Sequence, residues 1–152
     1  PNVDISKNFT ISFWFKAISS TDNVVLFDSV DGGKYFRAFF TSEDLKIQLP
    51  NKTYTVSSSV TYTEWTHFVL VKNGEGMGVY LNGVLAFSSD ITNKMSTVTL
   101  MDLNFGAIAK NKTVYHLSSL KIMKYAITHI GVSGWDGIPV DNKIERLLNN
   151  NF

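Results

Sequence analysis

The sequence predicts an all-β protein, a sandwich or barrel of short strands with one short helix near its C-terminal end. Three observations lead to this fold class: short segments with alternating apolar and polar residues, turn residues between them, and a single stretch with helical spacing. The 152 residues are 44% hydrophobic and 18% charged, which is typical of a globular chain with a large core. We expect one domain over residues 1–152, cut from a larger protein, because the chain opens directly into a strand.

The first half of the chain contains five segments with the period-two pattern of a half-buried strand. Residues 9–16 place four apolar side chains on one face: Phe9, Ile11, Phe13 and Phe15. Residues 34–40 place two rows on opposite faces, Tyr35, Arg37 and Phe39 on one and Phe36, Ala38 and Phe40 on the other. The remaining strands are expected over residues 23–27, 45–49 and 54–60.

The second half continues the pattern and contains the most apolar strand, residues 65–71. Asn82-Gly83 separates residues 77–81 from 84–87, which predicts a hairpin with a type I′ turn because both residues tolerate positive φ. Further strands are expected over residues 98–105 and 114–125. A short helix is expected near residues 144–148, where apolar residues repeat at i, i+3 and i+4. The buried core should include Phe13, Trp65, Val69 and Leu81.

Four segments, in the same order along the chain, resemble the laminin-G-like and concanavalin-A-like family. Residues 65–83 resemble its "W-H-H-V-A-V … Y-V-N-G" hairpin, and residues 9–14 resemble its "F-T-I-S-x-W" strand. Residues 115–128 are similar to its closing strand, and residues 144–148 occupy the place of its final helix. Pentraxins, phage tail and bacterial surface proteins, and the lectin-like half of clostridial neurotoxin receptor-binding regions share this architecture. The resemblance implies a two-sheet antiparallel jelly-roll sandwich and a role in recognition, although a fold alone does not define a function.

The composition argues against several other functions. The net charge of +1 gives no field suited to nucleic acid, and the absence of cysteine excludes thiolate chemistry. No apolar run approaches the 18 residues of a membrane span. Glycosidases of this architecture alternate acidic residues along one strand, and no such run occurs, so we expect no enzyme activity. The histidines lack zinc-type spacing, and His67 is expected to be a structural residue under the sheet.

Two pairs of residues could supply oxygen ligands to calcium, the one cofactor that the sequence leaves open. These are Asp28 with Asp31, and Asp102 with Asn104, because calcium binds carboxylate, amide and carbonyl oxygens. Turn formation is the alternative explanation for Asp31, which precedes two glycines. The loop that corresponds to the pentraxin calcium loop, residues 106–113, contains no carboxylate, so a calcium site of that type is not expected.

Aromatic residues beside turns are the candidates for ligand contact, because sugars stack on aromatic faces while nearby polar groups bind their hydroxyls. Trp135 is the first choice, with Asp136 as its hydrogen-bonding neighbour, since glycines at positions 134 and 137 bracket the pair. Tyr35 and Tyr115 could lie nearby. The alternative for each aromatic residue is ordinary packing in the core or at the edge of the sandwich.

The sequence therefore predicts a non-catalytic recognition module that binds a cell-surface glycan or glycoprotein receptor. We expect it to be extracellular, on a cell or virion surface, within a larger surface, virion or toxin protein. A structural module that contacts other domains of an assembly, such as a phage tail or adhesin, is the first alternative. A glycoside-active enzyme domain is the second.

Overall fold

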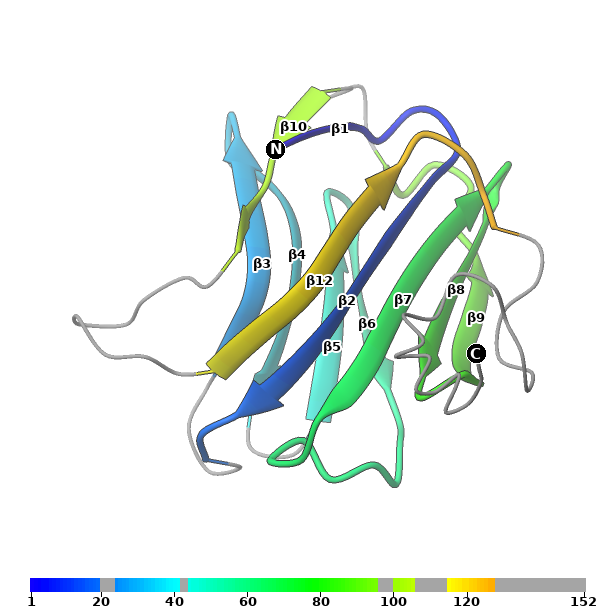
Figure 1. The fold of residues 1–152 in the computed structure, drawn as a ribbon. Helices are drawn as coiled ribbons and strands as arrows, with labels where there is room; N and C mark the ends of the chain where they lie inside the picture. The colour runs from blue at the N-terminus through cyan, green and yellow to red at the C-terminus, as the bar shows by residue number, and fades with distance from the viewer. Residues whose placement is uncertain (20–23, 42–43, 96–99, 106–114, 128–152) are drawn as a thin grey trace.

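The computed structural model describes residues 1–19, 24–41, 44–95, 100–105 and 115–127. These residues form two five-stranded antiparallel sheets packed face to face, with a small two-stranded sheet at one end, which confirms the predicted sandwich (Figure 1). Within them the secondary structure consists of strands and turns, and no helix is long and apolar enough to cross a membrane. The predicted helix at residues 144–148 lies outside the described residues.

The two large sheets are named here by their central strands. The β4 sheet has the order β11 (Asn104–Phe105), β3 (Val24–Asp31), β4 (Lys34–Thr41), β5 (Asp44–Leu49) and β6 (Lys52–Val56). The β7 sheet has the order β12 (Tyr115–Met123), β2 (Phe9–Ala17), β7 (Thr66–Asn73), β8 (Gly76–Leu81) and β9 (Val84–Asp90). The small sheet pairs β1 (Asn2–Asp4) with β10 (Leu100–Asp102). In Figure 1 the β4 sheet lies behind β12, β2 and β7.

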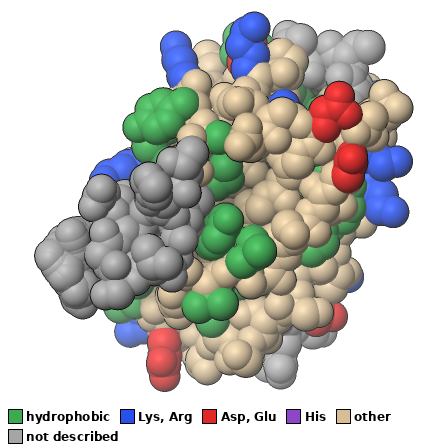
Figure 2. All heavy atoms as spheres, turned by 90° about the vertical axis from the view of Figure 1, so that its right-hand side faces the viewer, with side chains coloured by type: hydrophobic (Ala, Val, Ile, Leu, Met, Phe, Trp, Pro, Cys, Tyr) green, Lys and Arg blue, Asp and Glu red, His purple; other side chains and the backbone are tan. Residues whose placement is uncertain are grey.

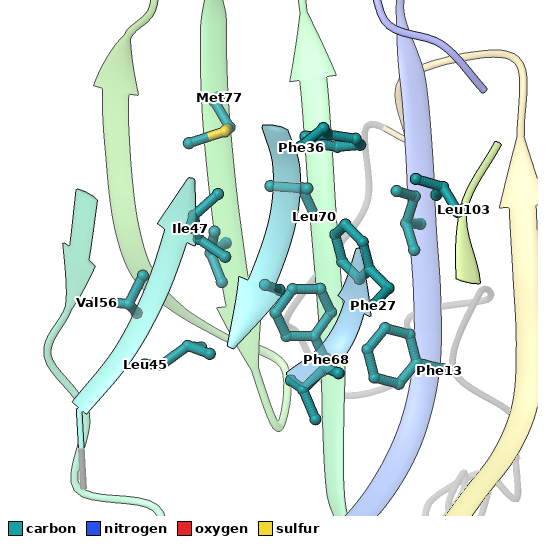
Figure 3. Packing of buried hydrophobic residues seen from close by; sticks show 14 of the residues in the cluster. Phe13, Phe27, Phe36, Leu45, Ile47, Val56, Phe68, Leu70, Met77 and Leu103 are labelled. Carbon is teal, nitrogen blue, oxygen red and sulfur yellow. The ribbon is translucent and has the colours of Figure 1, made fainter. Parts of the chain in front are cut away.

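Phenylalanine is the most frequent residue in the core between the sheets, where it packs among leucine, isoleucine and valine side chains (Figure 3). Alternation along β2 and β4 turns every second residue inward, so that each sheet contributes a row of rings. Phe13 and Phe68, which are Cα partners in neighbouring strands, stack with ring centroids 4.8 Å apart. Phe27 of the opposite sheet lies edge-on to Phe68 at 6.3 Å, so aromatic contacts join the two sheets.

The predicted burial of Trp65 is wrong. Phe13, Val69 and Leu81 are buried as expected, but Trp65 is 46% exposed. It precedes β7 and has the same parity as His67 and Val69, which point to the outer face of the β7 sheet. The side chains that fill the core are instead those with the parity of Phe68, such as its Cα partner Leu81. Because residues 65–71 are apolar on both faces, the sequence did not show which face is turned toward the core.

The Asn82-Gly83 hairpin is confirmed. Asn82 has a φ of 52° and Gly83 a φ of 81°, and the two residues join β8 directly to β9. The Asn82 side chain also accepts a hydrogen bond from the backbone N–H of His67 at 2.8 Å, and its own N–H donates to the His67 carbonyl at 2.9 Å. The turn is therefore attached to the start of β7 as well as to its own strands.

Replacing Gly83 by valine should lower the free energy of unfolding by about 1–3 kcal/mol, because a β-branched residue is strained at positive φ. Thermal unfolding followed by circular dichroism measures the effect, expected at about 2–4 °C for each kcal/mol. Gly76→Ala is the control, because a Cβ at that position would meet its nearest atom at an ordinary 3.5 Å. Equal melting temperatures for the valine variant and the unsubstituted protein would contradict the turn geometry.

The other strands agree with the sequence except in their limits. The strand expected over residues 54–60 is β6 (Lys52–Val56), and the one expected over residues 98–105 is divided into β10 and β11. The division falls at Leu103, which is buried and whose N–H bonds to the Pro1 carbonyl at 2.7 Å. β1 was not expected, since three residues are too few for an alternation to be visible.

Candidate functional site

The outer face of the β4 sheet holds an aromatic and charged surface. Along β4, alternation turns Phe36 and Phe40 into the core and leaves Tyr35, Arg37 and Phe39 partly exposed on the other side. The Cα partners of these residues on β3 and β5 place polar side chains on the same face. We call the group the Arg37 surface and define it by six residues: Asp28, Tyr35, Arg37, Phe39, Lys46 and Gln48.

Arg37 lies at the centre of this surface between two rings. Its guanidinium carbon is 4.7 Å from the centroid of Tyr35 and 4.6 Å from that of Phe39, both within cation–π range. Its Nε donates to Oε1 of Gln48 at 2.6 Å, and the two residues are Cα partners in neighbouring strands. Two rings and a short hydrogen bond thus fix the orientation of the guanidinium plane.

Charged side chains flank the arginine on both neighbouring strands. Asp28 on β3 is the Cα partner of Arg37 and is partly exposed. Lys46 on β5 is the Cα partner of Phe39, and its ammonium donates to Oγ1 of Thr55 at 2.7 Å. The surface therefore combines aromatic faces with hydrogen-bond donors and one acceptor carboxylate.

Of the residues predicted to contact ligand, the structure brings only Tyr35 to this surface. Tyr115 is a correction, because it is 6% exposed on the inner side of β12, and its hydroxyl donates to the Leu26 carbonyl. Its ring therefore belongs to the core and offers no face to a sugar. Trp135 and Asp136 lie outside the described residues, and their role stays a prediction.

The predicted calcium ligands are only partly brought together. Asp31, Asp102 and Asn104 line one open pocket of about 350 Å³, where β10 and β11 meet the end of β3. Asp28 is not part of that lining, although it is the Cα partner of Asn104. Within the described residues, no three acidic, histidine or cysteine side chains are grouped closely enough to hold a metal ion. Calcium binding stays a prediction.

His67 occupies the outer face of the other sheet and is held as a neutral residue. It is 1% exposed, its Nε2 lies 3.1 Å from Oγ of Ser12, and its ring centroid lies 4.8 Å from that of Trp14. Burial lowers the pKa of His67 to about 3, and the charge of Lys121 contributes in the same direction. An imidazole that stays neutral and enclosed at physiological pH agrees with the structural role expected from the sequence.

Sequence reasoning identified the row of Tyr35, Arg37 and Phe39 on one strand face but attached no function to Arg37 or Phe39. It also missed Lys46 and Gln48, because their proximity follows from the pairing of β4 with β5. The available signal was the alternation itself, in which an aromatic–arginine–aromatic row faces away from an apolar row.

A comparison with models of protein families matches residues 1–129 to the concanavalin A-like lectin/glucanases superfamily. The chain belongs to that superfamily. The matched residues include every strand described above, so the concanavalin A-like domain comprises both sheets and the Arg37 surface. A comparison with curated protein sequences finds no match.

Solved structures with the same fold include binding domains of bacterial toxins. The receptor-binding domain of botulinum neurotoxin D matches with a TM-score of 0.61 and 17% identity, over 83% of this chain and 36% of that one. The ligand-binding domain of botulinum neurotoxin serotype D, in complex with N-acetylneuraminic acid, matches with a TM-score of 0.63 and 17% identity, over 82% of this chain and 35% of that one. The binding domain of paraclostridial mosquitocidal protein 1 matches with a TM-score of 0.62 and 18% identity, over 84% of this chain and 36% of that one.

These similarities concern the fold. The concanavalin A-like domain spans about a third of the length of each of these structures. Its superfamily includes both lectins and glucanases, whereas the three solved neighbours are described as binding domains. The resemblance to laminin-G-like proteins and to clostridial receptor-binding regions is thereby confirmed.

Proposed function

We propose that this domain is a non-catalytic recognition module that binds a cell-surface glycan through the Arg37 surface. The observation that carries the proposal is the arrangement of Arg37 between the rings of Tyr35 and Phe39, with Gln48 holding its Nε. Aromatic rings left on the outer face of a sheet, around an ordered polar group, are typical of binding surfaces. The superfamily and the toxin binding domains support the same class of function.

The chemical groups of the Arg37 surface are better suited to binding a glycan than to hydrolysing one. Glycoside hydrolysis ordinarily uses two carboxyl groups on either side of the scissile bond. The Arg37 surface offers one carboxylate, that of Asp28, beside the cationic side chains of Arg37 and Lys46. We place the domain outside the cell, on a cell or virion surface or within a secreted toxin, because that is where a glycan-binding module meets its ligand.

A second candidate function is contact with other protein domains, and β9 is the feature that favours it. This strand is the outermost strand of its sheet, and Val84 and Leu85 on it are 67% and 50% exposed. β9 lies on the right of Figure 1, the side onto which Figure 2 looks, where hydrophobic side chains form small groups. An apolar edge strand is a ready site for pairing with another chain.

Replacing Tyr35 by alanine should weaken glycan binding roughly ten-fold or more, because the substitution removes a ring face at the centre of the proposed site. A glycan array identifies the ligand, and titration calorimetry with the best-binding glycan measures the affinity. The substitution removes the cation–π contact with Arg37, worth about 0.5–1 kcal/mol, so the melting temperature should fall by about 1–4 °C.

Lys52→Met is the matched control, because Lys52 is an exposed cation 5.6 Å from the Tyr54 ring on the same sheet but outside the Arg37 surface. Its glycan affinity should remain unchanged. If the protein bound no glycan on the array, the proposed function would be overturned. Binding that survives Tyr35→Ala but is lost in Trp135→Ala would instead place the site at the loop that the sequence analysis favoured.

A further inference from the structure

Arg37 has hydrogen-bonding capacity that the protein leaves unused. A guanidinium carries five N–H donors in one plane, and Gln48 takes the one on Nε. Among the described residues, no hydrogen-bond or ion-pair partner is found for either Nη group. The four remaining donors are on the two terminal nitrogens, and one N–H of each points outward at the end of the plane.

This free edge matches one kind of ligand group. With Nε occupied, an approaching acceptor meets Nη1 and Nη2 end-on, and two parallel N–H···O bonds to a carboxylate have that geometry. The rings of Tyr35 and Phe39 occupy the space beside the plane, so its edge is the part best placed to bind a ligand. Because Gln48 and the rings already order the side chain, a ligand meets an arginine that has little conformational freedom left to lose.

The charges around Arg37 favour an anion that also carries hydroxyl groups. Lys46 adds a second cation on the same face, held against the sheet by its bond to Thr55. Asp28 opposite Arg37 is an acceptor that could bind hydroxyl groups of the same ligand. A carboxylate bound at the arginine edge, with hydroxyls toward Asp28 and a ring face against Tyr35, describes an acidic sugar better than an acidic peptide.

We infer that the Arg37 surface selects glycans that end in a carboxylate-bearing sugar, with Arg37 binding the carboxylate through both Nη groups. The inference rests on the proposed function and specifies its ligand class. Arg37 is the specificity-determining residue, and Gln48 is a positioning residue that acts through it.

The test compares two ligands that differ only at the carboxyl group. One is an oligosaccharide with a terminal sialic acid or uronic acid, and the other is the same oligosaccharide with that carboxyl reduced to an alcohol. The protein should bind the acid roughly 10–100-fold more tightly, the range expected for charge-assisted hydrogen bonds. Arg37→Lys retains the charge but has neither the planar fork nor its two parallel donors, so the preference should fall to a few-fold.

Two further variants separate recognition from folding. Gln48→Met leaves the guanidinium in place but releases its Nε, so the preference for the acid should decrease several-fold while the melting temperature changes little. This variant also keeps the inference testable if Arg37→Lys does not fold. Lys52→Met should keep both the affinity and the preference of the unsubstituted protein, since it removes a cation from the same sheet outside the surface.

The possible failures can be told apart. Equal affinity for the acid and its reduced form, with binding still dependent on Tyr35, overturns the inference and leaves the proposed function in place. An undiminished preference in Arg37→Lys overturns the assignment of Arg37. An absence of binding to either oligosaccharide, combined with binding to an acidic peptide that Arg37→Lys abolishes, overturns the proposed function itself.

Discussion

Replacing Phe68 by alanine should lower the free energy of unfolding by about 3–5 kcal/mol, the range for removing a large buried aromatic side chain. The ring is fully buried, stacks on Phe13 at 4.8 Å and meets Phe27 of the opposite sheet. Its loss leaves a cavity between the sheets and removes a contact that joins them. Urea unfolding measures the change through its midpoint.

Trp65→Ala is the comparison for that experiment. Trp65 is the larger side chain but is 46% exposed, with its ring centroid 6.4 Å from that of His116. Its truncation should cost about 1 kcal/mol or less, since nearly half of its surface is in water and it lies outside the core between the sheets. If the tryptophan variant proved the less stable of the two, the assignment of inner and outer faces along this strand would be wrong.

Acidification should destabilise the protein through His67. Its pKa in the folded state is about 3, below the value of 6.5 for an unperturbed histidine, so the unfolded state binds the extra proton between those two values. The stability linked to His67 is therefore fully present above pH 6.5 and is lost as the pH falls toward 3. The slope approaches about 1.4 kcal/mol per pH unit, and the total loss reaches a few kcal/mol.

The measurement is the free energy of unfolding at a series of pH values from 7 to 4. Carboxylates also titrate in the lower part of this range, so the contribution of His67 is read as a difference from His67→Gln. Glutamine retains a polar group near Ser12 but does not titrate, and its slope between pH 6.5 and 5 should be smaller. Identical slopes for the unsubstituted protein and His67→Gln would refute the role of His67.

Much of the fold was predictable because the local chemistry and the tertiary structure agree. In residues 9–16 and 34–40, alternation decided both the strand and the face that became buried. The Asn82-Gly83 turn was predictable because few residue pairs tolerate two consecutive positive φ values. These features depend on neighbours in sequence, which is the information that a single sequence contains.

Features that depend on pairing or on a covering segment were not predictable. Val69 and Val71 are buried on the outer face of their sheet, packed against partly buried Tyr80, Ala126 and Ile127. Nothing in the composition of residues 65–71 distinguishes that face from the core, which explains the error at Trp65. The bond from Arg37 to Gln48 similarly requires the register between two strands.

The position of β2 has a consequence for how the protein is made. β2 lies between β7 and β12, so Phe15 meets Thr66 on one side and Leu117, roughly 100 residues later in the chain, on the other. At 5–20 residues per second, a ribosome needs about 5–20 s to synthesise that interval. During this time one long edge of a phenylalanine-rich strand has no partner. The nascent chain must therefore be kept from associating with its neighbours until β12 emerges, and expression should be more sensitive to chaperone supply than the stability of the finished domain suggests.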